Sequence, residues 1–189
     1  GYSMTNIGVT GHRFLAETEK LVRSIDEALE IIEGHYESPY FLLSSLAEGA
    51  DRLVPHRAFA RWEEARLIVP LPLDVDDYMQ DFKTLTSKVD FINLMTRAEE
   101  IIEAPDVSKR GDAYQAAGYH VVQNCDVLIA IWDGAEAQGK GGTADIVAKA
   151  SQMKLPLIWI HAGNRKCGTE TPISLGEAQG KITLKNFKD

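Results

Sequence analysis

The stretch Cys125-Asp126-Val127-Leu128-Ile129-Ala130-Ile131-Trp132-Asp133-Gly134 decides the fold of this chain. Its centre, residues 127–132, is continuously apolar rather than alternating, which is typical of a strand buried on both faces of a parallel sheet. Four other runs share this pattern, and a further run is weaker. The four are Ile7–Thr10, Phe41–Ser45, Leu67–Leu71 and Leu155–Ile160, and the weaker one is Glu100–Ala104.

Helical patterns lie between these runs. In residues 16–33, apolar side chains recur at three- and four-residue spacing, and Gly34 follows as the expected C-terminal cap. Four more helices are expected, over residues 49–62, from Ser87 as N-cap, over residues 112–124 and over residues 143–153. Because strand and helix alternate, we predict an α/β fold with a doubly wound, mainly parallel, Rossmann-like sheet of about six strands and helices on both faces.

The composition fits one globular domain. The chain has 189 residues, of which 44% are hydrophobic and 25% are charged, close to the average of folded domains. We expect the Rossmann-like domain to span residues 1–162, and residues 163–189 to form an irregular tail or a linker to further domains of a longer protein. Two cysteines without a metal-binding pattern, no secretory signal and no apolar stretch near the ~20 residues that span a bilayer predict a cytoplasmic protein without a membrane partner.

The charge balance and the histidines bear on partners and metals. Acidic residues number 28 and basic residues 20, which gives a formal net charge of −8. Surfaces that bind nucleic acid usually carry a basic stripe, and none stands out here, so we expect no nucleic-acid partner. The five histidines form no HxxxH or HExxH pattern, so no metal site and no cofactor is expected.

The candidate site follows from the expected sheet. Ligands of open parallel sheets bind at the carboxyl ends of the strands. The polar and glycine residues that follow three of the strands are therefore the candidate ligand-binding residues. They are Gly11, His12 and Arg13 after the first strand, Ser45, Glu48, Gly49 and Asp51 after the second, and Asp133, Gly134, Gly141, Gly142 and Thr143 after the strand at residues 127–132.

The run Gly141-Gly142-Thr143 is the most informative of these. Glycines let the backbone approach an anion closely, and a helix start offers free N–H groups and the positive end of the helix dipole. An ordinary glycine-rich loop with Thr143 as N-cap explains the same residues equally well. Arg13 could hold a phosphate through two hydrogen bonds or pair with a nearby acid. His12 is more often a structural hydrogen-bonding residue than a base.

The acidic candidates also have two interpretations. In a nucleotide site, Glu48, Asp51 and Asp133 would bind sugar hydroxyls or a base. As structural residues, Glu48 and Asp51 would favour the start of the following helix, and Asp133-Gly134 is a favoured turn pair. No GxSxG sequence surrounds Ser45, so a serine nucleophile is not expected.

Four runs in this order resemble bacterial SLOG-type domains of the superfamily that holds the LOG phosphoribohydrolases and the DNA-processing protein DprA. They are residues 9–13, 46–54, 125–134 and 141–147, and the resemblance covers about residues 6–162. It implies a Rossmann-like sheet, a nucleotide-derived ligand and a phosphate held by Gly141, Gly142 and Thr143. It also implies a homodimer. The apolar face around Phe91 and Leu94 would either supply its contacts or belong to the core.

The chain departs from the LOG pattern at the catalytic position. LOG proteins carry a PGGxGTxxE signature with a catalytic glutamate, and Gly142-Thr143 match its GT pair. The glutamate position is Ile146 here, and Asp145 lies one place earlier, which turns a helical side chain by ~100°. This departure favours binding of a ligand over its cleavage. In an enzyme, Glu48 or Asp145 would have to replace the missing glutamate.

Three functions remain open at this point. The first is a binding or sensing module for a nucleotide-derived ligand. The second is an N-glycosidase that cleaves a nucleoside monophosphate through an oxocarbenium-like state, which a carboxylate stabilises. The third is a structural or interaction domain with a degenerate pocket.

Overall fold

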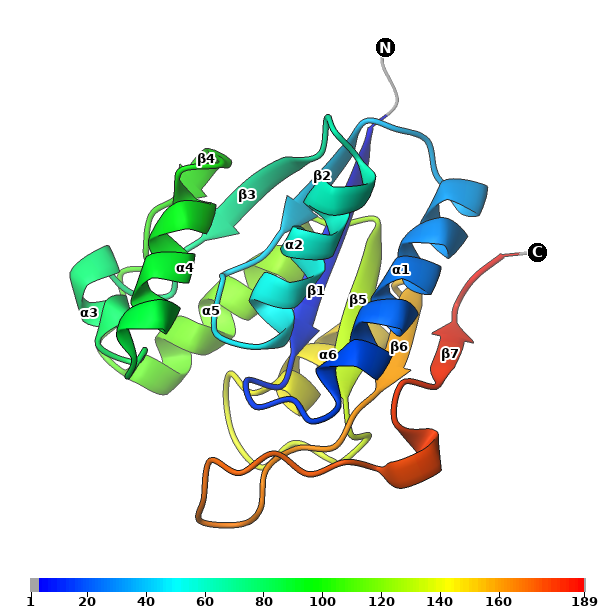
Figure 1. The fold of residues 1–189 in the computed structure, drawn as a ribbon. Coiled ribbons are helices and arrows are strands. Elements are labelled where there is room, and N and C mark those ends of the chain that lie inside the picture. The colour runs from blue at the N-terminus through cyan, green and yellow to red at the C-terminus, as the bar shows by residue number, and fades with distance from the viewer. Residues whose placement is uncertain (1–3, 189) are drawn as a thin grey trace.

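The computed structural model describes residues 4–188, and in it helices cover both faces of a seven-stranded sheet (Figure 1). The strands are β1 (Thr5–Gly11), β2 (Tyr40–Leu43), β3 (Arg66–Pro70), β4 (Ala98–Ile102), β5 (Val127–Trp132), β6 (Leu157–His161) and β7 (Ile182–Lys185). Their order in the sheet is β4-β3-β2-β1-β5-β6-β7. β7 runs antiparallel to β6, whereas the other neighbours pair in parallel. The predicted fold class is confirmed.

The helices divide between the two faces of the sheet. They are α1 (Thr18–His35), α2 (Ala50–Arg61), α3 (Val75–Met79), α4 (Leu85–Met95), α5 (Arg110–Gln123) and α6 (Thr143–Gln152), with a short 3-10 turn at Gly176–Ala178. α1 and α2 pack together on one face, and α5 and α6 pack together on the other (Figure 1). Right-handed crossovers produce this division, because the chain steps outward from β1 to β4 and then returns to β5 through α5.

Alternate side chains of the central strands enter two separate cores. In β5, Ile129 and Ile131 pack into the core beneath α1 and α2, whereas Leu128 and Ala130 pack into the core beneath α5 and α6. All four are fully buried. The continuous apolar run of β5 is therefore explained by burial on both faces.

The direction of the strand order reverses at β1. This strand pairs with β2 on one side and with β5 on the other. The connection after β1 leads through α1 toward β2, and the connection after β5 leads through α6 toward β6. Connections that diverge in this way leave a crevice at the carboxyl ends of β1 and β5, where such folds bind ligands.

The segment after β6 contains regular structure, where an irregular tail or linker was expected. Its strand β7 pairs along β6, with Leu184 opposite Ile158. Gln179 is buried and ties the segment to the rest of the domain. Its Oε1 accepts hydrogen bonds from the N–H of Gly163 at 3.0 Å and of Leu175 at 3.1 Å, and its Nε2 donates to the carbonyl of Ala16 at 2.8 Å.

Three helix ends differ from the expected ones. Gly34 lies inside α1 and does not cap it. Thr84, not Ser87, caps α4, because its hydroxyl accepts a hydrogen bond from the N–H of Ser87 at 3.1 Å. Gly142 is the N-cap of α6, and Thr143 is its first helical residue.

The apolar face expected around Phe91 and Leu94 is part of the core, since their exposed fractions are 0% and 2%. The exposed apolar residues of α4 are instead Leu85, Val89 and Ile92. No helix among the described residues has the length and apolar character that a bilayer span requires.

Candidate ligand-binding site

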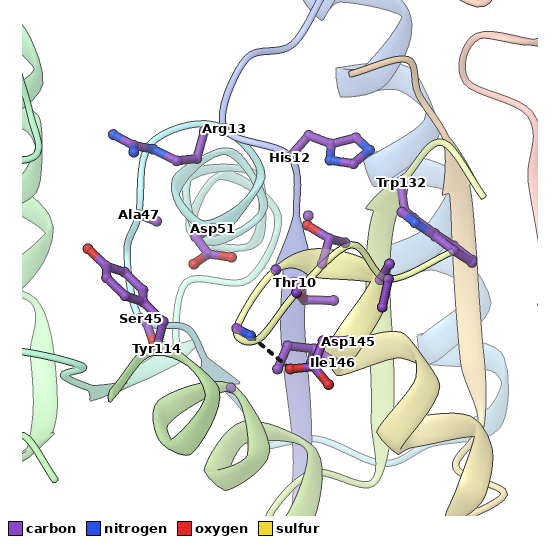
Figure 2. Close-up of a pocket in the computed structure, with 18 of the residues that line it drawn as sticks. Thr10, His12, Arg13, Ser45, Ala47, Asp51, Tyr114, Trp132, Asp145 and Ile146 are labelled. Carbon is purple, nitrogen blue, oxygen red and sulfur yellow. Dashed lines mark hydrogen bonds between the residues drawn. The ribbon is translucent and has the colours of Figure 1, made fainter. Parts of the chain in front are cut away.

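A pocket of about 460 Å³ lies in the crevice between the carboxyl ends of β1 and β5 (Figure 2). The segment from β2 into α2, the loop from β5 to α6, one side of α5 and the loop after β6 also contribute to its walls. Most of the candidate residues line it, whereas three do not. Those in the lining are Gly11, His12, Arg13, Ser45, Asp51, Asp133, Gly141, Gly142, Thr143 and the weaker candidate Asp145. Those outside the lining are Glu48, Gly49 and Gly134.

The loop before α6 is shaped by Asp145. Its carboxylate accepts a hydrogen bond from the N–H of Gly141 at 2.8 Å (Figure 2). It also accepts from Gln115 Nε2 at 2.9 Å and from the Tyr119 hydroxyl at 3.0 Å. Burial opposes ionisation of Asp145, but these hydrogen bonds outweigh it and lower its pKa. Gly141 has φ of +83°, and a Cβ there would lie 2.8 Å from Cβ of Tyr114. The loop therefore needs glycine at this position.

The start of α6 leaves backbone donors facing the pocket. No hydrogen bond of the described residues uses the N–H groups of Thr143 and Ala144, and no side chain caps this helix. Both residues line the pocket, as does Gly142, where a Cβ would meet nothing within 4 Å. Free first-turn N–H groups and the helix dipole make such a position suited to an anion.

Ile146, at the position of the LOG glutamate, serves packing between helices. Its exposed fraction is 3%, and it belongs to the core beneath α5 and α6. A Cβ on Gly118 of α5 would lie 2.3 Å from Cδ1 of Ile146, so Gly118 makes the close helix contact possible. This position therefore offers no carboxylate to the pocket.

His12 and Asp133 link the ends of β1 and β5. The backbone N–H of Asp133 donates to His12 Nε2 at 3.0 Å, so this nitrogen accepts and the ring is neutral. Burial lowers the pKa of His12, against the opposing influence of Asp133. The Asp133 carboxylate accepts from the N–H of Ala135 at 2.9 Å, which supports the turn interpretation of Asp133-Gly134.

Arg13 and Glu48 form an ion pair at the edge of the pocket. Arg13 Nη2 lies 2.5 Å from Glu48 Oε1 and also donates to the carbonyl of Asp81 at 3.0 Å. The other oxygen of Glu48 accepts from the Ser87 hydroxyl at 2.6 Å. Glu48 therefore orients Arg13, and the prediction that it binds ligand hydroxyls is corrected because its oxygens face α4 and Arg13.

Gly49 and Gly134 have structural reasons to be glycine. Gly49 has φ of +82°, and a Cβ there would lie 2.4 Å from the carbonyl oxygens of His12 and Arg13. Gly134 has φ of +84°, and a Cβ would lie 2.9 Å from the Trp159 ring. Both let the chain turn beside the pocket rather than contact what fills it.

Asp51 projects from the first turn of α2 into the pocket (Figure 2). Burial raises its pKa from 3.8 to about 7, although a backbone hydrogen bond from Ala47 and the charges of Arg52 and Arg13 favour ionisation. Ser45 lies on the same side of the pocket, and its carbonyl accepts from the Tyr78 hydroxyl at 2.9 Å.

Several lining residues were missed by sequence reasoning. Tyr114, Trp132 and Arg165 are the most prominent of them. Trp132 is the last residue of the apolar strand β5, and Tyr114 lies inside α5, so neither follows the end of a strand as the candidate residues do. Arg165 follows the end of β6, so the end-of-strand argument would have reached it if applied to that strand too. Among residues 4–188, no group of His, Cys, Asp and Glu has the arrangement of a metal site.

The fold and pocket define this chain as a Rossmann-like α/β domain with a ligand crevice at its topological switch point. Its structure is similar to that of DNA processing protein A from Helicobacter pylori, at 16% sequence identity and a TM-score of 0.59, over 94% of this chain and 70% of that chain. It also aligns with the structural-genomics protein TM1055, at 15% identity and a TM-score of 0.49, over 82% of this chain and 72% of the other. No protein-family model and no curated protein matches the sequence. The Rossmann-like fold that the resemblance implied is confirmed, and DNA processing protein A shares it.

The similarity to DNA processing protein A corrects one expectation. That protein was solved for its mode of binding single-stranded DNA. We expected no nucleic-acid partner for this chain because of its net charge of −8. The similarity to a protein that binds single-stranded DNA contradicts that expectation. Net charge describes the whole surface, whereas a binding crevice depends on the local charges and N–H groups that line it.

Proposed function

We propose that this domain binds a nucleotide or nucleotide-derived ligand, with a phosphate at the start of α6. The observation that carries the proposal is the set of unused N–H groups at Thr143 and Ala144, which open into a pocket at the switch point. Gly142 precedes them and leaves space for an anion to approach the backbone. The turn at Gly11 borders the same pocket from β1.

The rest of the pocket suits the remainder of such a ligand. The lining combines apolar surface with a few polar side chains, which is the usual make-up of small-molecule sites, and its volume lies in their range. Asp51 and Ser45 are the candidates for sugar hydroxyls or a base edge. A protonated Asp51 would donate a hydrogen bond, and an ionised one would accept.

One observation favours the second candidate function, N-glycosidic cleavage. The raised pKa of Asp51, about 7, is that of a general acid suited to neutral pH. The carboxylates considered for the missing glutamate do not compete for this role, because Asp145 holds the loop and Glu48 holds Arg13. Binding remains the preferred proposal, since Ile146 occupies the family's catalytic position.

A thermal-shift panel tests the proposal. The probes are the nucleoside mono-, di- and triphosphates, ADP-ribose, NAD, cyclic nucleotides and an eight-residue oligothymidylate. A ligand at a hundredfold its Kd stabilises the fold by ~2.7 kcal/mol, a shift of several degrees for a domain of this size. No shift with any probe would refute the proposal, and a shift with the oligonucleotide alone would assign the pocket to nucleic acid instead.

Gly142→Val shows whether the shift comes from this pocket. A Cβ at this position would meet nothing within 4 Å and φ is −81°, so we expect the variant to fold. Because valine is a poorer N-cap than glycine, we expect its unliganded melting temperature to fall slightly. We expect its ligand shift to be lost, because the side chain occupies the approach to the α6 backbone. Gly34→Ala, within α1, is the matched control and should keep the shift. Base release from a stabilising nucleotide, lost in Asp51→Asn, would convert the binding proposal into the enzymatic one.

A further inference from the structure

The segment after β6 brings a second arginine, Arg165, to the pocket that Arg13 also lines. Residues 164–173 form a hairpin in which Arg165 pairs with Pro172, and the N–H of Lys166 donates to the carbonyl of Thr171 at 2.9 Å. Arg165 and the neighbouring Asn164 line the pocket. A residue of the expected tail therefore reaches the same space as the start of α6.

The hairpin is held firmly where it leaves the sheet. A Cβ on Gly163 would lie 2.1 Å from the carbonyl oxygen of Ile173, so the two arms approach as closely as glycine allows. Gln179 bonds the backbone of Gly163 and also that of Ala16, in the loop that follows β1. The base of the hairpin, two residues before Arg165, is thus fixed relative to β1, whose carboxyl end forms one wall of the pocket.

The surroundings of Arg165 leave its charge uncompensated. Its guanidinium carbon lies 5.6 Å from the centre of the Phe14 ring, and that of Arg13 lies at the same distance from the same ring. Arg13 is neutralised by Glu48, and the pocket-lining Lys140 is paired with Asp112 at 3.0 Å. Within residues 4–188, Arg165 has neither an ion pair nor a side-chain hydrogen bond.

We propose that Arg165 forms a second anion subsite, so that the pocket prefers a nucleotide with two phosphoryl groups to one with a single phosphate. This inference rests on the proposed function, which assigns the first phosphate to the start of α6. A planar guanidinium with five donors binds phosphate oxygens through paired hydrogen bonds. Its contact with Phe14 orients this donor group without using its N–H groups in an ion pair.

The test compares monophosphates with diphosphates by isothermal titration calorimetry. The probes are the four ribonucleoside monophosphates and their diphosphates, in buffer without Mg²⁺, because the metal would mask the second phosphate. We expect the wild type to bind its best diphosphate about tenfold more tightly than the matching monophosphate, the worth of one charge-assisted hydrogen bond. Arg165→Ala should reduce this ratio to about one while leaving the affinity for the monophosphate unchanged.

Two further variants separate this role from general effects. Lys166→Ala removes an exposed positive charge next to Arg165 that does not line the pocket, and it should leave the ratio unchanged. Arg165→Lys keeps the charge and should retain part of the preference. A ratio that survives in Arg165→Ala, or an equal loss for both ligand classes, would overturn the inference while the proposed function stands. Failure of the wild type to bind any of the eight nucleotides would overturn this inference, and the wider thermal-shift panel would then decide the proposed function.

Discussion

Asp51 gives the sharpest test of the electrostatics of the pocket. Burial raises its pKa from 3.8 to about 7, against the favourable effects of Ala47, Arg52 and Arg13. A shift of about three pK units corresponds to ~4 kcal/mol between the protonated and ionised forms. Because Asp51 borders the pocket, water screens part of this penalty, and we expect about 2 kcal/mol to remain.

Asp51→Asn replaces the carboxyl by a neutral group of the same shape. As pH rises from about 4 to 7, the folded wild type retains a proton on Asp51 that the unfolded chain releases, so its free energy of unfolding falls relative to the variant. We expect the two proteins to differ by less than ~0.5 kcal/mol near pH 4, and the variant to be about 2 kcal/mol more stable at pH 8.

Urea unfolding at the two pH values measures this difference. Asp76→Asn removes the same charge from an exposed position on α3 and serves as the control. An Asp51→Asn variant that is no more stable than the wild type at pH 8 would show that burial does not penalise the Asp51 carboxylate. So would a stability difference that is the same at both pH values.

Three further predictions concern packing and loop geometry. Gly34→Ala should stabilise the protein by about 0.5 kcal/mol in thermal unfolding, because Gly34 is helical with open space around it, and a destabilised variant would argue for a left-handed cap instead. Gly118→Ala should lower the free energy of unfolding by about 1–3 kcal/mol, because the added methyl group clashes with Ile146. The double variant with Ile146→Ala should lose less stability than the sum of the two single variants, and additive losses would exclude this contact as the cause. Asp145→Ala should speed amide exchange at Gly141, because the carboxylate that accepts its N–H is removed. The fold lowers the pKa of Asp145, so the stability that the wild-type carboxylate adds should disappear as pH falls below about 4, and a stability difference that does not change with pH would contradict this.

The α/β architecture could be predicted because its signal is local. Each parallel strand is a short apolar run, and β5 was predicted with the bounds that the structure gives it. β7 escaped prediction because Ile182–Lys185 is short, half exposed and ends in a lysine, as an edge strand often does. The predicted helix caps lie one to three residues from the observed ones. Ser87 and Thr143 suit a cap by residue type, and only the backbone geometry shows that Thr84 and Gly142 take this position instead.

The rule that ligands bind at the carboxyl ends of parallel strands predicted most of the candidate site. This rule led to His12, Asp133 and the loop before α6, because parallel strands end at one edge of the sheet. Glu48 was given a ligand role because sequence does not show that Arg13 and Ser87 would meet its oxygens. Arg165 was overlooked because the rule was applied to three strands and not to β6. Its exact place at the pocket also depends on a hairpin that Gln179 ties to the rest of the domain.

In the proposed function, a nucleotide phosphate binds the backbone at the start of α6. A titration of ¹⁵N-labelled protein with the nucleotide that gives the largest thermal shift, followed by amide chemical shifts, tests it most directly. We expect the largest changes at Thr143 and Ala144, with smaller ones at Gly11 and His12, and we expect these changes to be lost in Gly142→Val. Changes confined to the exposed face of α4, or unchanged signals at the start of α6 in a protein that binds the nucleotide, would contradict it.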